Sequence, residues 1–114
     1  PKEVRRVISK ETADDLTKML VSVVDKGYDR AKVPGYFIAG KTGTAQIASG
    51  KGYEEDESMH SFIGYAPAFD PKFIVLIKMD KPQGIRFAAE SLTPVFSKIM
   101  GYLLTYYEIP PDYK

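Results

Sequence analysis

The chain has 114 residues, 44% of them hydrophobic and 27% charged, which is the composition of an ordinary soluble domain with one modest core. Sixteen basic and fifteen acidic side chains leave a formal net charge of +1, which excludes a general electrostatic attraction to nucleic acid. The chain has no cysteine and no apolar run longer than Phe73 to Ile77, so we expect no disulfide, no thiol nucleophile and no membrane segment in it.

The first predicted element is a helix that begins after Ser9 or Thr12. Both residues are suited to cap a helix, and Asp15, three residues after Thr12, makes a weak variant of the capping box. Gly27 is suited to end the helix. Apolar side chains recur between these limits at helical spacing, at Leu16, Met19, Leu20, Val23 and Val24.

Three strands are predicted next. Aromatic and β-branched residues favour a strand at Tyr36–Thr44, and the polar segment 49–58, which holds two glycines and four acidic residues, is predicted to be a loop. Met59–Ala66 and Lys72–Met79 are the second and third strands. The link at 67–71 is too short for a parallel crossover, so these two strands must be antiparallel.

A second helix is predicted from about Ala89, with Thr93 and Pro94 suited to its cap and first turn. It ends before Ile109-Pro110-Pro111. The fold class is therefore α+β: a three-stranded antiparallel sheet with an N-terminal and a C-terminal helix, and with Tyr36–Thr44 on the open edge. The buried face of the second helix is predicted to hold Val95, Phe96, Ile99, Met100, Leu103, Leu104 and Tyr107.

The most informative stretch, Gly35 to Gln46, satisfies two unrelated signatures. Gly35–Thr42 matches G-x-x-x-x-G-K-[ST], the phosphate-binding P-loop, and the apolar strand that ends at Asp80 resembles the one that holds Mg²⁺ in those enzymes. A P-loop, however, must lead into a helix near its lysine, and Gly43 and the glycines that follow it disfavour one here. A P-loop NTPase fragment is therefore the alternative interpretation.

The second signature is Lys41-Thr42-Gly43, the third motif of the penicillin-binding proteins and serine β-lactamases. That chemistry needs the motif on an edge strand. The lysine attracts a substrate carboxylate, the hydroxyl groups donate hydrogen bonds to it, and glycine lets the substrate backbone approach. An edge strand also offers free N–H groups for an oxyanion hole. The predicted strand supplies this context.

Longer strings make the resemblance specific. From about Ser9 to Asp112 the chain resembles the C-terminal part of the transpeptidase domain of class B penicillin-binding proteins. These are bacterial D,D-transpeptidases of septal or elongation peptidoglycan synthesis and the targets of β-lactams. The resemblance implies a membrane-anchored parent with an extracytoplasmic catalytic domain, no cofactor, and stem peptides and β-lactams as ligands. The strings that carry it are Ala39–Gln46, Ser61–Pro67, Asp70-Pro71, Thr93–Phe96 and Ile109–Asp112.

The resemblance also implies a role for each residue of the motif strand. Lys41 would support the proton network of the nucleophile and attract the substrate carboxylate. Thr42 and Thr44 would bind that carboxylate, and the Thr44 backbone N–H would form half of the oxyanion hole. Gly43 would keep the strand open to the ligand, and Gln46 would lie just beyond the site.

The nucleophile of that family is not found in the chain. No serine is followed by lysine three residues later, as Ser-x-x-Lys requires, and Ser-x-Asn fails because there is no asparagine. We therefore expect residues 1–114 to be the C-terminal portion of the domain, inactive without the N-terminal portion that bears the nucleophile. The chain opens with Pro1 rather than Met, which agrees with a piece of a longer protein.

Three further expectations follow. The resemblance implies that the two helices cover opposite faces of the sheet and that two more strands come from the absent portion. The strand at 72–79 would then expose an edge, which predicts marginal stability, a partner chain or self-association. His60, the single histidine, is expected to be structural or exposed, because a catalytic histidine needs partners. A non-catalytic interaction module remains a third interpretation.

Overall fold

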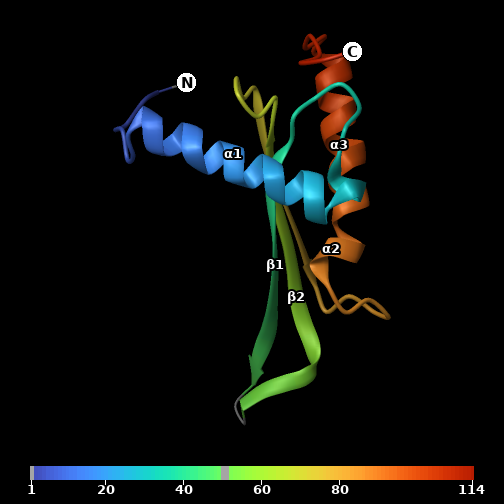
Figure 1. The fold of residues 1–114 in the computed structure, drawn as a ribbon. Coiled ribbons are helices and arrows are strands. Elements are labelled where there is room, and N and C mark those ends of the chain that lie inside the picture. The colour runs from blue at the N-terminus through green and yellow to red at the C-terminus, as the bar shows by residue number, and fades with distance from the viewer. Residues whose placement is uncertain (1, 50–51) are drawn as a thin grey trace.

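The computed structural model describes residues 2–49 and 52–114, and it has the predicted α+β architecture (Figure 1). The sheet has the order β1-β2-β3 with both pairs antiparallel, so β1 is an edge strand as predicted. Along the chain the elements are α1 (Lys10–Gly27), the short 3₁₀ helix η1 (Asp29–Ala31), β1 (Ala39–Ser49), β2 (Gly52–Ala66), β3 (Phe73–Asp80), α2 (Ala88–Ser91) and α3 (Thr93–Tyr106).

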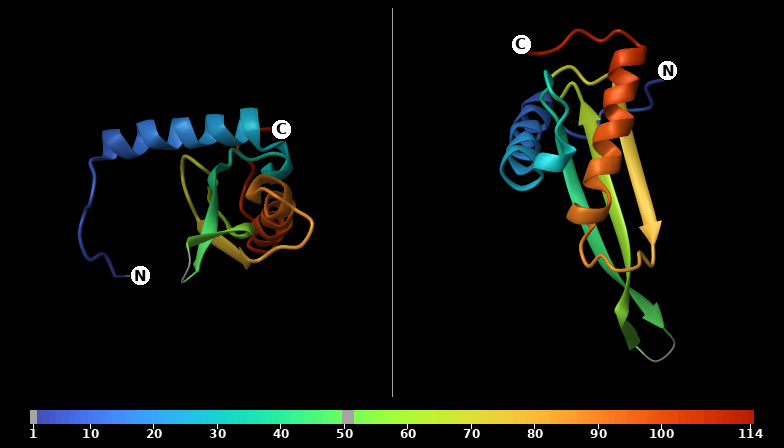
Figure 2. Two further views of the ribbon diagram at one scale, coloured as in Figure 1. Left: turned by 90° about the horizontal axis from the view of Figure 1, so that it is seen from below. Right: turned by 90° about the vertical axis from the view of Figure 1, so that its right-hand side faces the viewer.

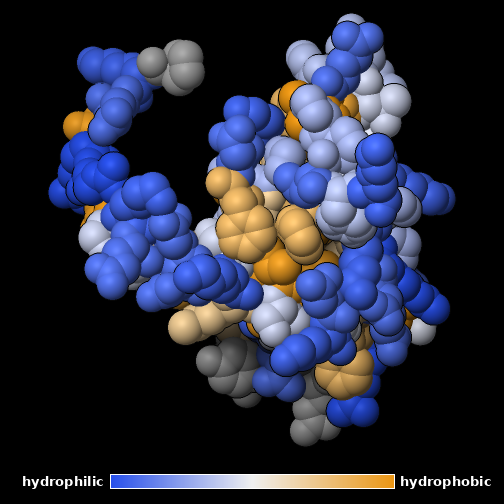
Figure 3. Space-filling view, turned by 45° about the horizontal axis from the view of Figure 1, so that its top comes forward, coloured by the Kyte–Doolittle hydropathy of each residue, from blue (hydrophilic) through white to orange (hydrophobic). Residues whose placement is uncertain are grey.

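Helix α1 begins and ends where its caps predict. Ser9 is the N-cap, and its Oγ accepts a hydrogen bond from the Thr12 amide at 3.1 Å. Only the second half of the predicted apolar stripe is covered, because Val24 is fully buried whereas Leu16 and Met19 are exposed. The side of α1 seen in Figure 3 is hydrophilic, as expected for an amphipathic helix.

The β1–β2 hairpin is longer than the sequence predicts, and it projects well beyond the helices in Figure 1. β1 starts three residues later than expected and runs on to Ser49, while β2 starts at Gly52 instead of Met59. The predicted loop at 49–58 is therefore wrong for the part that the structure describes; positions 50 and 51 lie outside it. Backbone pairing continues past the apolar residues, from Ala45↔Met59 through a register shift after Gln46.

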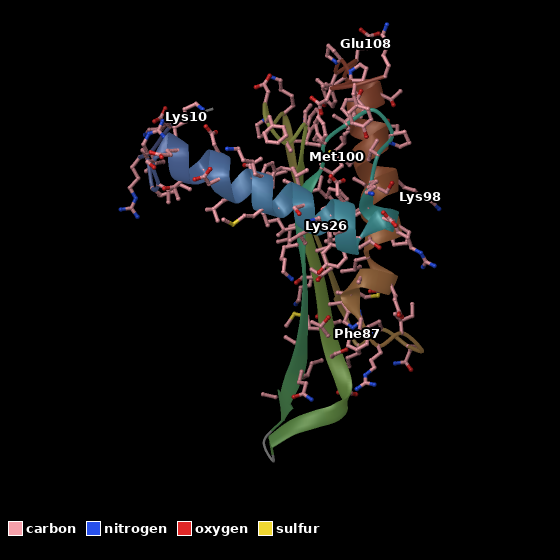
Figure 4. The ribbon with its side chains drawn as sticks, in the orientation of Figure 1. Lys10, Lys26, Phe87, Lys98, Met100 and Glu108 are labelled. Carbon is pink, nitrogen blue, oxygen red and sulfur yellow. The ribbon has the colours of Figure 1, made fainter. Side chains whose placement is uncertain are left out.

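One face of the sheet packs against α3, and we call it the helix face (Phe62, Gly64, Val75 and Ile77). Phe62 and Phe96 are fully buried there with ring centroids 4.7 Å apart. Figure 4 marks Met100, also fully buried, where α3 meets the sheet. The core of the molecule thus lies between α3, the end of α1 and this face.

The opposite side is the open face (Ile63, Tyr65, Ile74 and Leu76), and α1 covers it only at one end. Figure 2 shows α1 crossing the β1 edge of the sheet, with α3 on the other side of the strands. Val21 packs with Ala39 and Ala68, and Tyr65 lies against this small cluster. Ile74 and Leu76 remain 68% and 66% exposed. The implied arrangement of helices on opposite faces therefore holds only in part.

The second predicted helix is divided into α2 and α3 at Leu92. Pro94 lies in the first turn of α3 as predicted, but the N-cap is Leu92 and not Thr93. The Thr93 side chain is buried and donates a hydrogen bond to the Ala89 carbonyl at 2.5 Å, which ties the two helices together. Phe96, Met100 and Leu104 form the buried stripe; the residues predicted to be buried that are instead exposed are Val95, Ile99 and Tyr107.

Candidate functional site

Lys41-Thr42-Gly43 and the following Thr44, together called the motif from here on, lie on β1, the edge strand. Successive side chains of a strand point to opposite faces, so the motif is divided between the two. The pairing Thr42↔Phe62 puts Thr42 and Thr44 on the helix face, and Lys41↔Ile63 puts Lys41 and Gly43 on the open face. Among the strands that the structure describes, none pairs with the outer edge of β1.

Lys41 is exposed, and its ammonium group folds back over its own strand. Nζ donates a hydrogen bond to the Thr42 carbonyl at 3.0 Å and lies 6.0 Å from the centre of the Tyr28 ring. Both contacts leave the charge in water. Lys41 is therefore a cation available to an anionic ligand at the strand edge.

Thr42 is half-buried and bonded to a residue outside the motif. Its Oγ1 lies 2.7 Å from the hydroxyl of Tyr28, the C-cap residue that follows α1. Tyr28 is thus a neighbour of both Lys41 and Thr42. Sequence reasoning missed it, and the one available signal is an aromatic residue placed directly after the helix-ending Gly27.

Thr44 is exposed and connects β1 to α2. Its Oγ1 accepts a hydrogen bond from the Ala88 amide, the first residue of α2, at 3.2 Å. In Figure 4 the end of α1, marked by Lys26, and the start of α2, just after Phe87, both lie beside the strands. The two threonine hydroxyls are therefore held by the ends of two different helices.

His60, opposite Thr44 on β2, is fully buried and fully hydrogen-bonded. Its Nδ1 lies 2.8 Å from Ser91 Oγ, and its Nε2 lies 3.1 Å from Ser58 Oγ and 3.2 Å from the Arg86 carbonyl. Because a carbonyl can only accept, Nε2 carries a proton and donates it. His60 thus links β2 to the segment that leads into α2, which is the structural role expected of it.

Gly43 and Gln46 have different surroundings. A methyl group at Gly43 would lie 2.6 Å from Ser61 Oγ on the neighbouring strand, so the absence of a side chain leaves room for Ser61. Gln46 is exposed and, with Thr44, lines an open hollow of ≈ 610 Å³ beside the segment 82–87. Gln46 lies two positions beyond Thr44 on the same strand.

The surroundings of Lys41 contradict the P-loop alternative. β1 continues through Lys41 and Thr42 to Ser49, so no helix begins at the lysine. Asp80 ends β3 and pairs with Lys78 at 3.2 Å. Without a helix N-terminus aimed at the Gly35–Thr42 segment, a phosphate-binding cradle is not formed.

Residues 2–49 and 52–114 contain no group of three or more His, Cys, Asp or Glu side chains placed to hold a metal ion. No helix in the described part is both long enough and apolar enough to cross a membrane.

Comparison with known proteins gives consistent results. The family model described as "Penicillin binding protein transpeptidase domain" matches residues 1–101. The probable peptidoglycan D,D-transpeptidase PbpC of Pseudomonas aeruginosa is 41% identical over 113 residues, which are 96% of this chain and 20% of that protein. Stage V sporulation protein D of Bacillus subtilis is 43% identical over 98 residues, 84% of this chain and 15% of that protein. The chain spans about a fifth of the length of the curated relatives it matches.

Solved structures agree with the sequence matches. The transpeptidase domain of penicillin-binding protein 3 from Burkholderia pseudomallei, without ligand, superimposes with a TM-score of 0.86 at 38% identity, over 96% of this chain and 34% of that one. Penicillin-binding protein 3 of Mycobacterium tuberculosis, complexed with ampicillin, gives a TM-score of 0.81 at 34% identity, over 97% of this chain and 28% of that one. The helices and the sheet described above thus match one part of a larger catalytic domain.

Proposed function

The chain belongs to the penicillin-binding protein transpeptidase family, and we propose from this membership that it forms one wall of the active site of a serine-type peptidoglycan D,D-transpeptidase. The observation that carries the proposal is the position of Lys41 to Thr44 on a sheet edge, with an exposed ammonium group and two hydroxyl groups. A wall of this kind suits a ligand that presents a carboxylate next to an amide or lactam carbonyl.

The reaction is acyl transfer between two stem peptides. A serine attacks a peptide carbonyl and forms an acyl-enzyme with loss of the leaving amine; the amine of a second stem peptide then attacks the ester and releases the serine. Lys41 attracts the substrate carboxylate and supports the proton network of that serine. The hydroxyls of Thr42 and Thr44 bind the carboxylate, and the Thr44 backbone N–H stabilises the oxyanion. Gly43 admits the ligand, and Gln46 borders the site.

We place the nucleophile in an N-terminal portion of the domain, because no serine of residues 1–114 has a lysine three residues later, and we expect the chain alone to be inactive. The open face supports such a neighbour. A hollow of ≈ 480 Å³ lies between α1 and the sheet, and the residues around it include Ile8, Leu16, Leu20, Tyr65 and Ile74. An apolar surface of this kind marks a place where more protein packs. Residues 1–114 are then the C-terminal portion of one domain, in a membrane-anchored parent whose catalytic domain is extracytoplasmic.

Covalent labelling by a fluorescent penicillin tests the proposal. A penicillin mimics the stem peptide, and the acyl-enzyme it forms is long-lived, so labelling survives denaturing electrophoresis. We expect labelling when the chain is joined to the nucleophile-bearing portion and none for the chain alone. Absence of labelling in the complete, folded domain would contradict the proposal and leave the interaction module as the better interpretation.

Two lysine variants sharpen that test. Lys41→Met removes the charge at the strand edge and should reduce labelling by at least tenfold, because a charged hydrogen bond is worth roughly 1.5–3 kcal/mol. Lys98→Met is the matched control: it removes an exposed lysine from α3, away from β1. Equal labelling of the two variants would overturn the assignment of Lys41.

A further inference from the structure

We propose that Tyr28 is a positioning residue of this site, which holds the Thr42 hydroxyl and the Lys41 ammonium group ready for a ligand carboxylate. The inference rests on the proposed function. It adds a residue from the end of α1 to a site otherwise built from β1. Two contacts of Tyr28 carry it. The Tyr28 hydroxyl lies 2.7 Å from Thr42 Oγ1, and the centre of the Tyr28 ring lies 6.0 Å from Lys41 Nζ.

Tyr28 is fixed from several sides before any ligand arrives. Its amide donates to the Val24 carbonyl at 3.0 Å and its carbonyl accepts from the Ala31 amide at 2.8 Å. Its ring meets the fully buried Phe62 edge-on, with centroids 6.2 Å apart and planes at 85°. With the backbone and the ring both anchored, the phenol oxygen has little freedom to leave Thr42. Such preorganisation lowers the entropy lost when a ligand binds.

The two hydroxyl groups act as one unit. Each has one proton to donate, and one of the two protons is used in the bond between them. The other proton remains for a ligand whichever way the bond points, and a hydroxyl that already accepts a hydrogen bond is a stronger donor. The pair therefore presents one oriented O–H next to a cation, the combination that recognises a carboxylate.

The Tyr28 ring adds a second effect on Lys41. A cation within about 6 Å of an aromatic ring is attracted by roughly 0.5–1 kcal/mol at an exposed site. That attraction, with the bond from Nζ to the Thr42 carbonyl at 3.0 Å, keeps the ammonium group near Thr42. Tyr28 thus brings the charge and the hydroxyl to the same stretch of the edge.

The chain offers a matched control for removal of the phenol oxygen. Tyr65 is also half-buried, and its hydroxyl lies 2.8 Å from Thr17 Oγ1, so it forms the same kind of tyrosine–threonine pair. That pair joins α1 to the open face and includes none of the motif residues. Tyr28→Phe and Tyr65→Phe therefore remove equivalent hydrogen bonds, one at the site and one away from it.

The experiment compares two probes on the complete domain, benzylpenicillin and its methyl ester, which lacks the carboxylate charge. We expect Tyr28→Phe to lower the second-order rate constant for labelling by benzylpenicillin about threefold to tenfold, which is the effect of one hydrogen bond. The rate constant for the methyl ester should stay within about twofold of its value in the unsubstituted domain. Tyr65→Phe should change neither. In a Thr42→Val background, Tyr28→Phe should have no further effect on the acid.

The ratio of the two rate constants is measured on one sample, so it does not depend on the fraction of protein that is folded. An unchanged acid-to-ester ratio in Tyr28→Phe would overturn the role of Tyr28 while leaving the proposed function in place. Additive effects of Tyr28→Phe and Thr42→Val would overturn it as well. Failure of the unsubstituted domain to react with either probe would overturn the proposed function and this inference with it.

Discussion

The two threonines of the motif lie on the same face of β1, yet different helix ends hold their hydroxyl groups. Thr42 is paired with Tyr28 at the end of α1, and Thr44 accepts from the Ala88 amide at the start of α2. The Thr44 hydroxyl can accept from Ala88 and still donate its own proton to a ligand. Each structural bond therefore leaves one hydroxyl proton for a ligand: that of Thr44 itself, and one of the two protons of the Tyr28–Thr42 pair.

A substitution at Thr44 tests this division of work. Thr44→Val leaves the Ala88 amide without its acceptor, and we expect a loss of about 1 kcal/mol of stability, the usual net value of one hydrogen bond. Thr44→Ser keeps the hydroxyl, so its free energy of unfolding should lie within a few tenths of about 1 kcal/mol of that of the unsubstituted chain. Hydrogen exchange of the Ala88 amide gives the local measurement. Equal exchange in all three proteins would contradict the bond.

Lys32 fixes the segment that follows Tyr28 and has a measurable titration. Its Nζ lies 2.7 Å from Asp29 Oδ1, and the hydrogen bond to Asp29 raises the pKa of Lys32 above its ordinary value of 10.5. A raised pKa means that the stabilisation linked to Lys32 is present at neutral pH and is lost as the pH rises through the folded-state pKa of this lysine. Stability at neutral pH should not depend on this titration.

We expect Asp29→Asn to bring the pKa of Lys32 back toward its ordinary value, because the substitution removes the main cause of the shift. NMR titration of the lysine side-chain nitrogens measures this directly. Asp25→Asn is a weaker test of the same kind, since Asp25 lies 3.9 Å from Lys32 Nζ. A larger shift in Asp25→Asn than in Asp29→Asn would show that the assignment of the main partner is wrong.

At the scale of elements, the sequence predicts best where the evidence is local. The cap at Ser9 gives the start of α1, and the apolar run of β3 gives a strand within one residue of the observed bounds. The sequence predicts that the first strand starts at Tyr36, but residues 36–38 lie outside β1, and two of them bond to the C-terminal segment. Tyr36 donates to the Ile109 carbonyl and the Phe37 amide donates to Asp112 Oδ2. Such long-range contacts leave no periodic pattern to read.

In the candidate site, too, the sequence predicts the local features and misses the long-range contacts. The motif places Lys41 to Thr44 on an edge strand because a short string and its propensities are both local. The partners of the motif could not be found in this way. Tyr28 lies 14 positions from Thr42 along the chain and Ala88 lies 44 positions from Thr44, and only the packing of α1 and α2 brings them together. The long hairpin was missed because polar residues pair through their backbones as readily as apolar ones.

The contact between β2 and α3 predicts that alanine destabilises the chain at one glycine, Gly64, and not at another, Gly101. A methyl group at Gly64 would lie 2.6 Å from Phe96 Cζ and 3.0 Å from the Ala39 carbonyl, inside the core. We expect Gly64→Ala to destabilise the chain by about 1–3 kcal/mol through overpacking, measured by urea unfolding. A second substitution, Phe96→Leu, should recover part of the loss by freeing space at the ring position.

Gly101 on α3 is the matched control. The nearest atom to a methyl group there is Val33 Cγ1 at 3.7 Å, an ordinary contact. Gly101→Ala should therefore be neutral or stabilising, by up to about 1 kcal/mol, because alanine is the better helix former. Equal destabilisation by the two alanines would contradict the close approach of α3 to Gly64.

At the scale of the whole molecule, the two faces of the sheet are unequal. Helix α3 buries the helix face, whereas Ile63, Ile74 and Leu76 on the open face are exposed to solvent. In the described part of the chain, β3 pairs only with β2, so its outer edge is free for a further strand. One face and one edge therefore remain for the portion of the domain that the proposed function requires.

This asymmetry predicts how the chain behaves by itself. Exposed apolar side chains beside a free strand edge favour association, so we expect concentration-dependent self-association of the isolated chain in sedimentation velocity. Leu76→Lys puts a charge in the middle of that surface and should shift the chain toward the monomer. Tyr102→Lys is matched in exposure, 65% against 66% for Leu76, but lies on α3 and should have no such effect. An equal shift in both variants would mean that added charge, and not the open face, controls association. If the unsubstituted chain is monomeric at all concentrations, the open face does not drive self-association.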